Sequence, residues 1–261
     1  MKYGFIGCGN MGGALARALA LATTDFAITD RSGRAAALAE ELSCSYLSAA
    51  EIAGDCPRIF LGVKPHLMRE VLAPLQPVLK KQKPLLITMA AGLTMEQIQE
   101  FAGCELPVIR IMPNTPVSVG KGVILYCVNE LVSPEDLNEF LMDMRFAGVM
   151  DPLEEKLIDA GSALSGSGPA FVYMFIEALA DGAVTCGIPR AKAMEYAAAT
   201  VIGAGELVLA SGQHPGQLKD AVCSPMGSTI SGIRALENHG FRAAAMEAVI
   251  ATYNRNKELG K

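Results

Sequence analysis

Residues 4–12 read Gly4-Phe5-Ile6-Gly7-Cys8-Gly9-Asn10-Met11-Gly12, and this stretch decides the fold of the first half of the chain. An apolar run begins at Tyr3 and leads directly into the glycines, and a helical pattern, Ala14 to Leu19, follows them. A strand, a tight glycine turn and a helix in this order let the backbone approach a pyrophosphate closely and point a helix N-terminus at it. The stretch therefore predicts a dinucleotide site formed by residues 6–12, and a glycine-rich turn without a ligand is the alternative.

Short apolar runs alternate with helical patterns from this stretch to about residue 150. The expected strands are Tyr3–Ile6, Phe26–Thr29, Ile59–Val63, Leu85–Met89, Val108–Met112 and Lys121–Val128. Alternation at this spacing indicates βαβ units and a parallel sheet. Beyond Asp151 every pattern is helical. We therefore predict an α/β Rossmann-type N-terminal domain, residues 1–151, followed by an all-α C-terminal domain, residues 152–261.

The composition indicates an oligomer. Hydrophobic residues make up 51% of the chain and charged residues 19%, which leaves little polar surface to cover a monomer. The expected helix from Arg190 to Ala210 is apolar around most of its circumference, so a polar outward face is nearly missing. Burial of this helix between subunits is the prediction, and burial inside a larger single domain is the alternative.

Several classes of function are disfavoured by the composition. The formal net charge of -5 gives no electrostatic attraction to nucleic acid or to an anionic membrane. The 7 cysteines form no CxxC pair, which is typical of reduced thiols in a cytoplasmic protein. We expect no membrane span and no signal peptide, because charged residues and glycines interrupt the apolar stretches. The 3 histidines have no metal-ligand spacing, so no metal site is expected.

Further cofactor contacts are expected after later strands. The second strand leads into Asp30, Arg31 and Ser32: Asp30 favours NAD by binding a ribose 2′-hydroxyl, whereas Arg31 and Ser32 favour a 2′-phosphate. Both possibilities stay open, as does a plain solvated loop. Ligands of open α/β sheets bind at the carboxyl ends of strands. The segments at these ends that we assign to the cofactor are Gly62-Val63-Lys64-Pro65 and Ala90-Ala91.

A loop between two C-terminal helices is the best candidate for substrate binding. The amides of Gly227, Ser228 and Thr229 stand at the start of a helix, and the hydroxyls of Ser224, Ser228 and Thr229 add donors, so the loop suits a carboxylate. The alternative is an ordinary helix start with Ser228 as its cap. No His–Asp pair is evident that could protonate an alkoxide, which favours a substrate that is already activated, such as an iminium.

Five segments together resemble the pyrroline-5-carboxylate reductase family over essentially the whole chain. They are the glycine-rich stretch 4–12, Val63-Lys64-Pro65, Arg110-Ile111-Met112-Pro113-Asn114-Thr115-Pro116, and Leu164-Ser165-Gly166-Ser167-Gly168-Pro169-Ala170 with the loop Cys223 to Thr229. The resemblance implies hydride transfer from NADPH, with NADH as the alternative, to the C=N bond of 1-pyrroline-5-carboxylate. The product would be L-proline, in the last step of proline biosynthesis.

The same resemblance implies roles for individual residues and an assembly. Ser224, Gly227, Ser228 and Thr229 would hold the substrate carboxylate, Thr229 would be catalytic through a hydrogen bond to the ring nitrogen, and Glu155 would approach that nitrogen. The helical domain would form homodimers, with a decamer of five dimers as a larger form. One departure is Met226, where the family usually has glycine; a side chain there is unfavourable if the position requires a positive φ.

Two other functions compete with this one. A β-hydroxyacid dehydrogenase or a related imine reductase shares the glycine fingerprint and a helical second domain, but the dehydrogenases resemble a group with a lysine on a long helix. No lysine lies between Ser165 and Arg190. A non-catalytic dinucleotide-binding regulator would keep residues 7–12 but has no need of a carboxylate receptor.

Overall fold

The computed structural model describes residues 1–259 and divides the chain into two compact units. The first unit comprises Met1–Ser167 and the residues from Thr252 onward, and the second comprises Gly168–Ala251. The fold class is as predicted, an α/β part followed by an all-α part. The expected domain boundary at residues 151 and 152 stays a prediction.

A single eight-stranded sheet runs through the first unit in the order β3-β2-β1-β4-β5-β6-β7-β8. Neighbouring strands are parallel except for the antiparallel pair β6 and β7. The strand order reverses between β1 and β4, which is where open α/β sheets bind their ligands. The strands are β1 (Tyr3–Ile6), β2 (Phe26–Thr29), β3 (Ser45–Tyr46), β4 (Arg58–Leu61), β5 (Leu85–Thr88), β6 (Val108–Met112), β7 (Gly122–Val128) and β8 (Gly148–Pro152).

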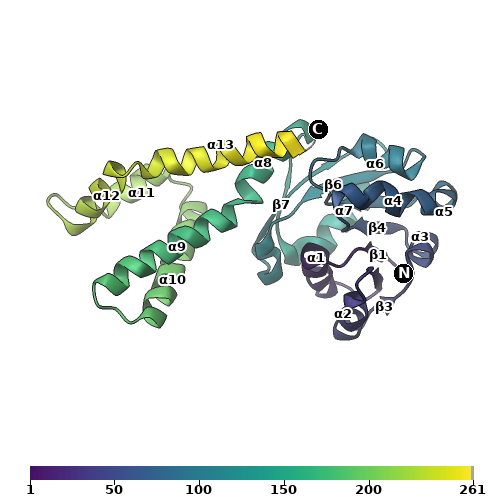
Figure 1. The fold of residues 1–261 in the computed structure, drawn as a ribbon, viewed down its shortest axis with the longest axis horizontal. Coiled ribbons are helices and arrows are strands. Elements are labelled where there is room, and N and C mark those ends of the chain that lie inside the picture. The colour runs from purple at the N-terminus through teal and green to yellow at the C-terminus, as the bar shows by residue number, and fades with distance from the viewer. Residues whose placement is uncertain (260–261) are drawn as a thin grey trace. The chain divides into compact units, whose positions relative to one another are not determined.

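Helices cover both faces of this sheet, as Figure 1 shows. One face packs against α1 (Asn10–Ala20), α2 (Arg34–Leu42) and α7 (Pro134–Asp143). The other packs against α3 (Ala49–Asp55), α4 (Met68–Leu72), α5 (Gln76–Gln82), α6 (Met95–Ala102) and α8 (Glu155–Ser165). Four short 3-10 turns complete the unit: η1 (Pro65–Leu67), η2 (Ala73–Leu75), η3 (Thr115–Val119) and η4 (Met144–Ala147). Strands covered on both faces read as continuous apolar runs, which is why their sequences could be identified.

The structure corrects the strand prediction at both edges of the sheet. The edge strands β3 and β8 were not predicted, and β8 occupies residues 148–152, where the sheet was expected to end. Both residues of β3 are exposed, and β8 contains no fully buried residue. Edge strands of this kind lack the apolar run or the alternation that identifies a strand in a sequence.

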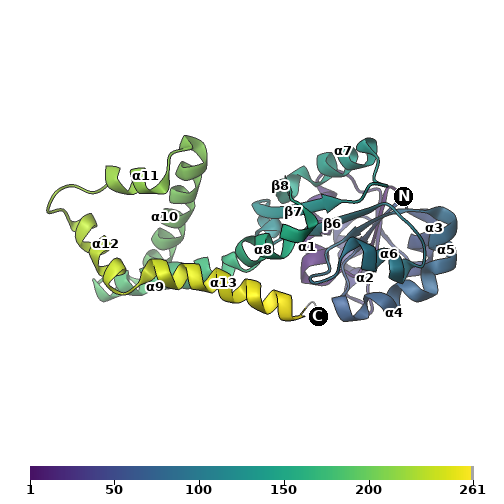
Figure 2. The ribbon, with the colours of Figure 1, turned by 90° about the horizontal axis from the view of Figure 1, so that it is seen from above.

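The second unit is helical (Figure 2), and its hydrophobic core is small. Its helices are α9 (Gly168–Thr185), α10 (Arg190–Ser211), α11 (Pro215–Ala221) and α12 (Ser228–Asn238), with most of α13 (Phe241–Leu259). Within this unit the buried hydrophobic residues are Ala180, Ala193 and Ala197. Helix α10 matches the predicted apolar helix and leaves most of its side chains exposed in the single chain.

Two helical stretches are long and apolar enough to cross a membrane by length and composition alone. They are Glu155–Thr185 and Arg190–Ser211, with mean hydropathy 1.2 and 1.3, and only 11% of each tested segment is buried. Glu177 and Asp181 lie within the first stretch and Glu206 within the second. An exposed apolar helix is equally what a subunit interface requires, and the comparisons below bear on that choice.

Candidate cofactor and substrate site

The glycine-rich turn lies where β1 meets α1, at the reversal of strand order. Gly7 has a φ of +102°, which disfavours any residue with a side chain. A Cβ added to Gly12 would come within 2.3 Å of the Gly7 carbonyl oxygen, and one added to Gly62, after β4, within 2.2 Å of the same atom. These three glycines are therefore required by packing within the protein itself.

Gly9 has a different explanation. Its φ is an ordinary -64°, and an added Cβ would meet nothing within 4 Å. Gly9 is also the N-cap of α1, where no side chain caps the first turn, so the first amides of the helix are available to a ligand. A glycine here leaves room for a ligand to come close to the protein backbone, and the geometry fits the pyrophosphate of a dinucleotide.

The neighbouring Cys8 side chain belongs to the core. It is buried, and burial, followed by the charge of Asp30 and the thiol of Cys44, raises the pKa of the Cys8 thiol to about 12. The thiol therefore stays protonated at neutral pH and is a poor nucleophile. Cys8 contributes to the turn through its backbone and its packing.

The residues after β2 are arranged around Asp30. The Ser32 hydroxyl donates to Asp30 Oδ2 at 2.8 Å, whereas Asp30 Oδ1 is buried without a hydrogen-bond partner among the described residues. A buried carboxylate oxygen without a partner is costly unless a ligand supplies a donor, and a ribose hydroxyl would do so. Arg31 is exposed and donates to Glu70 at 2.7 Å. A 2′-phosphate would have to compete with Glu70 for this guanidinium.

One cationic residue near this point was missed by the sequence analysis. Arg34 begins α2 and lines a cavity of about 460 Å³ together with Gly9 and Asn10. Within residues 1–259 it has no ion-pair partner, whereas Arg17 in the same cavity donates twice to Glu41. Its position three residues after Arg31, at the start of a helix, was the signal available in the sequence.

A cavity of about 520 Å³ joins the glycine turn to the ends of β4, β5 and β6. Half of the predicted cofactor residues meet here; the lining contains Gly9, Asn10, Met11, Gly62, Val63, Lys64, Pro65, Met89, Ala91, Met112 and Pro113. The residues after β2 do not line it, and neither does Ala90, whose side chain is buried in the core. The cavity therefore brings together segments that are far apart in the sequence.

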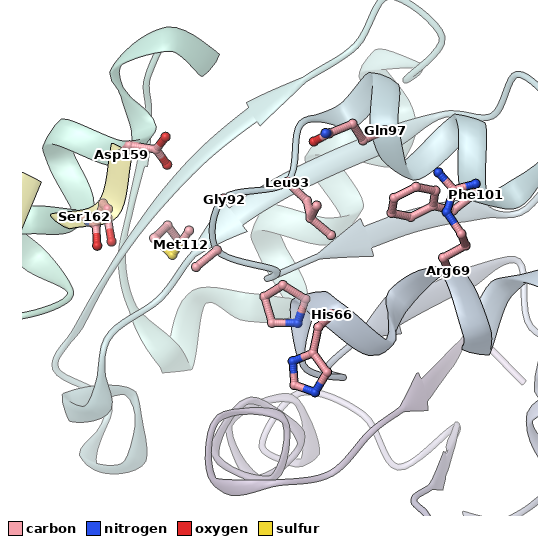
Figure 3. Close-up of a pocket in the computed structure, with 12 residues that line it drawn as sticks. His66, Arg69, Gly92, Leu93, Gln97, Phe101, Met112, Asp159 and Ser162 are labelled. Atoms are coloured by element: carbon pink, nitrogen blue, oxygen red, sulfur yellow. The ribbon is translucent and has the colours of Figure 1, made fainter. Parts of the chain in front are cut away.

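A second cavity, of about 620 Å³, shares Pro65, Ala91 and Met112 with the first (Figure 3). Figure 3 shows Gly92 and Met112 near its centre and Asp159 and Ser162 of α8 on one side. The two cavities therefore meet at these residues, next to the end of β5.

Two buried polar residues fasten α8 to this part of the sheet. Arg110 of β6 is 3% exposed and bridges Asp159 at 2.9 Å and Glu155 at 3.4 Å. At the other end of α8, the buried Asn114 donates to the Ser165 carbonyl and accepts from the Val123 amide, both at 2.9 Å. The sequence analysis predicted neither the contacts of Arg110 nor those of Asn114. The signal in the sequence was an arginine inside an apolar strand, which requires a buried anionic partner.

Glu155 already has protein partners in this arrangement. Besides Arg110, its Oε1 accepts the Met95 amide at the start of α6 at 2.8 Å. The residue therefore joins α6, β6 and the start of α8. Its expected approach to the ring nitrogen stays a prediction.

The candidate substrate loop belongs to the second unit and joins α11 to α12. Helix α12 begins with Gly227 as N-cap and has no side-chain cap, so the alternative with Ser228 as the cap is wrong. The hydroxyls of Ser224, Ser228 and Thr229 have no hydrogen-bond partner among residues 1–259. The Gly227 amide, one of the three expected donors, is instead taken up by the Ser224 carbonyl at 3.0 Å. Free amides and hydroxyls at one helix start can bind a carboxylate, and the amides left for it are those of Ser228 and Thr229.

Met226 adopts the conformation that made it questionable. The Gly227 amide donates to the Ser224 carbonyl at 3.0 Å, Pro225 is the second residue of the turn, and Met226, the third, has a φ of 57°. This is the pattern of a type II turn, which favours glycine at the third position. A side chain there costs about 1–2 kcal/mol.

The fold and the glycine cavity define a dinucleotide-binding protein of the Rossmann class with a helical second part. Comparisons with known proteins make this more specific. The family described as "NADP oxidoreductase coenzyme F420-dependent" matches residues 2–92, and the family described as "Pyrroline-5-carboxylate reductase dimerisation" matches residues 155–259.

Individual relatives agree over the full length. Pyrroline-5-carboxylate reductase of Escherichia coli is 41% identical over 266 residues, covering 100% of this chain and 98% of that protein. The structure of the Coxiella burnetii pyrroline-5-carboxylate reductase has a TM-score of 0.91 at 32% identity, covering 100% of this chain and 98% of that one. A Plasmodium falciparum pyrroline carboxylate reductase with NADP bound has a TM-score of 0.88 at 33% identity, with the same coverage.

The chain belongs to the pyrroline-5-carboxylate reductase family. The resemblance inferred from the motifs is thereby confirmed, and with it the assignment as an oxidoreductase. The dimerisation match over residues 155–259 also accounts for the two apolar helical stretches as an interface between subunits.

Proposed function

We propose that this chain reduces the C=N bond of 1-pyrroline-5-carboxylate to give L-proline, with NADPH as the preferred hydride donor. The observation that carries the proposal is full-length identity of 41% to a pyrroline-5-carboxylate reductase, together with a glycine turn whose Gly9 leaves space for a pyrophosphate. The bound nicotinamide would supply a hydride to the imine carbon. Residues of this chain would bind and orient the cofactor and the substrate.

On the cofactor side, the backbone at Gly7, Gly9 and Gly12 and the start of α1 would bind the pyrophosphate, in the turn that also contains Ile6, Cys8, Asn10 and Met11. Asp30 would accept a ribose hydroxyl at its free oxygen. Arg34, and Arg31 once released from Glu70, would face a 2′-phosphate, with Ser32 as a further donor.

The end of the cofactor that reacts would lie in the first cavity. Gly62, Val63, Lys64, Pro65 and Ala91 line that cavity, and the small residues allow a flat ring to approach the backbone. The buried Ala90 supports this segment from the core.

On the substrate side, the free amides and hydroxyls at the start of α12 would bind the carboxylate. The Ser224 and Ser228 hydroxyls and the Ser228 amide would serve this purpose, Gly227 would hold the turn through its bond to the Ser224 carbonyl, and the Thr229 hydroxyl would orient the ring nitrogen. The iminium nitrogen already carries its proton, so hydride addition to the carbon needs no general acid; a donor at nitrogen is needed only to protonate the amine that forms. Glu155 is proposed as a carboxylate that favours the cationic iminium.

The assembly and location follow from the same family assignment. The proposed unit is a homodimer, with five dimers forming a decamer as the larger assembly, and the proposed partner is a small molecule. We propose a cytoplasmic location, which the 7 free cysteines of the described chain support.

Steady-state kinetics on the purified full chain test the reaction and the cofactor together. NADPH and NADH oxidation would be measured with 1-pyrroline-5-carboxylate, and NADP⁺ reduction with a 3-hydroxy acid as the control for the competing dehydrogenase. The proposal expects imine reduction with a higher kcat/KM for NADPH. Turnover of the 3-hydroxy acid alone, or cofactor binding without turnover of the imine, would overturn it.

A further inference from the structure

The second cavity has an uneven distribution of charge. Of the residues that line it in the described chain, Arg69 and Asp159 carry a fixed charge. Arg69 is paired with Glu100 at 2.8 Å, so its charge is balanced within the protein. Asp159 is balanced less completely, because its partner Arg110 also serves Glu155. One guanidinium between two carboxylates leaves an excess of negative charge at the wall formed by α8.

Asp159 has one carboxylate oxygen that a ligand can use. Its Oδ1 accepts from Arg110 Nη2 at 2.9 Å, and its Oδ2 has no hydrogen-bond partner among residues 1–259. The side chain is 38% exposed and lines the cavity, as Figure 3 shows. Glu155 differs, because its Oε1 accepts the Met95 amide and its side chain lines another cavity. Of the two carboxylates on Arg110, Asp159 is therefore the one that a ligand in the second cavity can reach.

The same cavity adjoins the proposed place of the nicotinamide. It shares Pro65, Ala91 and Met112 with the cofactor cavity, and Asp159 and Ser162 lie on one side of it (Figure 3). Hydride transfer requires the imine carbon to lie about 3–3.5 Å from the reacting carbon of the cofactor. A substrate ring that meets the nicotinamide where the two cavities join would find its space in the second cavity.

We propose that Asp159 is a substrate-binding residue that pairs with the protonated ring nitrogen of the cyclic imine in the second cavity. The inference rests on the proposed function. A carboxylate stabilises the charged form of the imine, which is the form that accepts hydride. Arg110 holds the Asp159 carboxylate in place, and Glu155 adds its charge at longer range through the same arginine.

The role is electrostatic and involves no bond to Asp159. The hydride from the nicotinamide adds to the imine carbon, the π electrons of the C=N bond become the lone pair of the amine nitrogen, and Asp159 neither gives nor takes a proton. The positive charge leaves the nitrogen as the hydride adds. The carboxylate therefore contributes to binding of the charged imine more than to the chemical step, and its loss should raise KM more than it lowers kcat.

Two ring carboxylates of the same shape measure this interaction directly. L-Proline carries a cationic ring nitrogen, whereas tetrahydrofuran-2-carboxylate has an uncharged oxygen at that position. The inhibition constant of each would be measured against 1-pyrroline-5-carboxylate with the full chain, and the ratio of the two constants is compared between variants. Asp159→Asn removes the charge but keeps the shape and an oxygen for Arg110. Ser162→Ala is the matched control, because it changes the same wall of the cavity without changing its charge.

We expect Asp159→Asn to weaken inhibition by L-proline about tenfold or more relative to tetrahydrofuran-2-carboxylate. The dissociation constant for NADPH should stay within about twofold of wild type, as should the inhibitor ratio in Ser162→Ala. Equal weakening of both inhibitors in Asp159→Asn would show that the carboxylate serves only the fold, and it would overturn the proposal.

A second variant and two physical measurements cover a failure to fold. Asp159→Ser also removes the charge and should shift the inhibitor ratio in the same direction, and thermal unfolding and light scattering report fold and assembly for each sample. Loss of the fold in both Asp159 variants would make the residue a structural partner of Arg110 and would also contradict the proposal. Failure of the wild type to reduce the imine would refute the proposed function instead.

Discussion

Replacing Gly9 with alanine should separate cofactor binding from folding. The added methyl group would meet no protein atom within 4 Å, and the φ of -64° is accessible to alanine. The small loss at an N-cap is offset by the lower entropy of the unfolded chain, so stability should change by no more than about 0.5 kcal/mol. The same methyl group occupies the space in which the pyrophosphate must approach the backbone.

The loss of affinity can be estimated from the bonds at stake. If the methyl group moves the phosphate away from one amide at the start of α1, one charge-assisted hydrogen bond is lost, worth about 1.5–3 kcal/mol. The dissociation constant for NADPH should therefore rise roughly 10- to 150-fold. Fluorescence titration of NADPH measures this value, and circular dichroism measures the melting temperature.

Gly12→Ala is the matched control, because it adds the same methyl group three residues later. Its Cβ would lie 2.3 Å from the Gly7 carbonyl oxygen, so the backbone would have to move. We expect a cost of at least about 2 kcal/mol and a melting temperature roughly 4–8 °C lower. Wild-type affinity for NADPH in Gly9→Ala would refute the assignment of Gly9 as the pyrophosphate contact.

Three further predictions concern the substrate loop, the ribose and a helix cap. Thr229→Ala should lower kcat/KM for 1-pyrroline-5-carboxylate about ten- to a hundredfold with unchanged NADPH affinity, whereas Thr229→Ser should retain most activity. Full activity of the alanine variant would show that the hydroxyl has no part in the reaction. Asp30→Ala should raise the KM for NADH and spare kcat, shifting preference toward NADPH, and an unaltered ratio of the two efficiencies would contradict this. Ser48→Ala should lower the melting temperature at pH 7 by about 2–4 °C, because the Ser48 hydroxyl caps α3. The Ser48 hydroxyl and then its backbone amide lower the pKa of Glu51, so this stabilisation is present above the ordinary glutamate pKa and is lost as pH falls through the lower value. The difference in melting temperature should therefore be smaller near pH 3, and an equal difference at both pH values would contradict the assignment.

The sequence predicted those parts of the fold that local chemistry determines. The central strands are apolar runs because both faces of the sheet are covered, and β1, β2 and β6 have the predicted bounds. The start of α7 is another local feature, with the Ser133 hydroxyl accepting the Asp136 amide and Pro134 at the first position. The exposed edge strands carry no such pattern and were missed.

The candidate site likewise has one part that the sequence predicts and another that depends on packing. The glycine turn could be identified from spacing alone, because Gly7 and Gly12 meet local requirements of the backbone and Gly9 stands at the fixed position between them. The contacts of Arg110 and Asn114 could not, since they join residues 45 to 51 positions apart and depend on how α8 packs on the sheet. For Met226 the sequence showed only that a side chain replaces the family's usual glycine. That the position has a positive φ is known from the structure.

The small core of the second unit has a consequence for the substrate loop. Three alanines are its only buried hydrophobic residues among those described, whereas long apolar side chains of α9 and α10 are exposed in the single chain. A helical unit of this size cannot offset its conformational entropy with so little buried area. Association through the dimerisation region therefore has to supply much of the stability. Because α12 belongs to this unit, the free amides and hydroxyls at its start are held in place only as firmly as the dimer holds the unit. Subunit association is thus a condition for the preformed carboxylate site that we propose, in addition to its effect on the size of the particle.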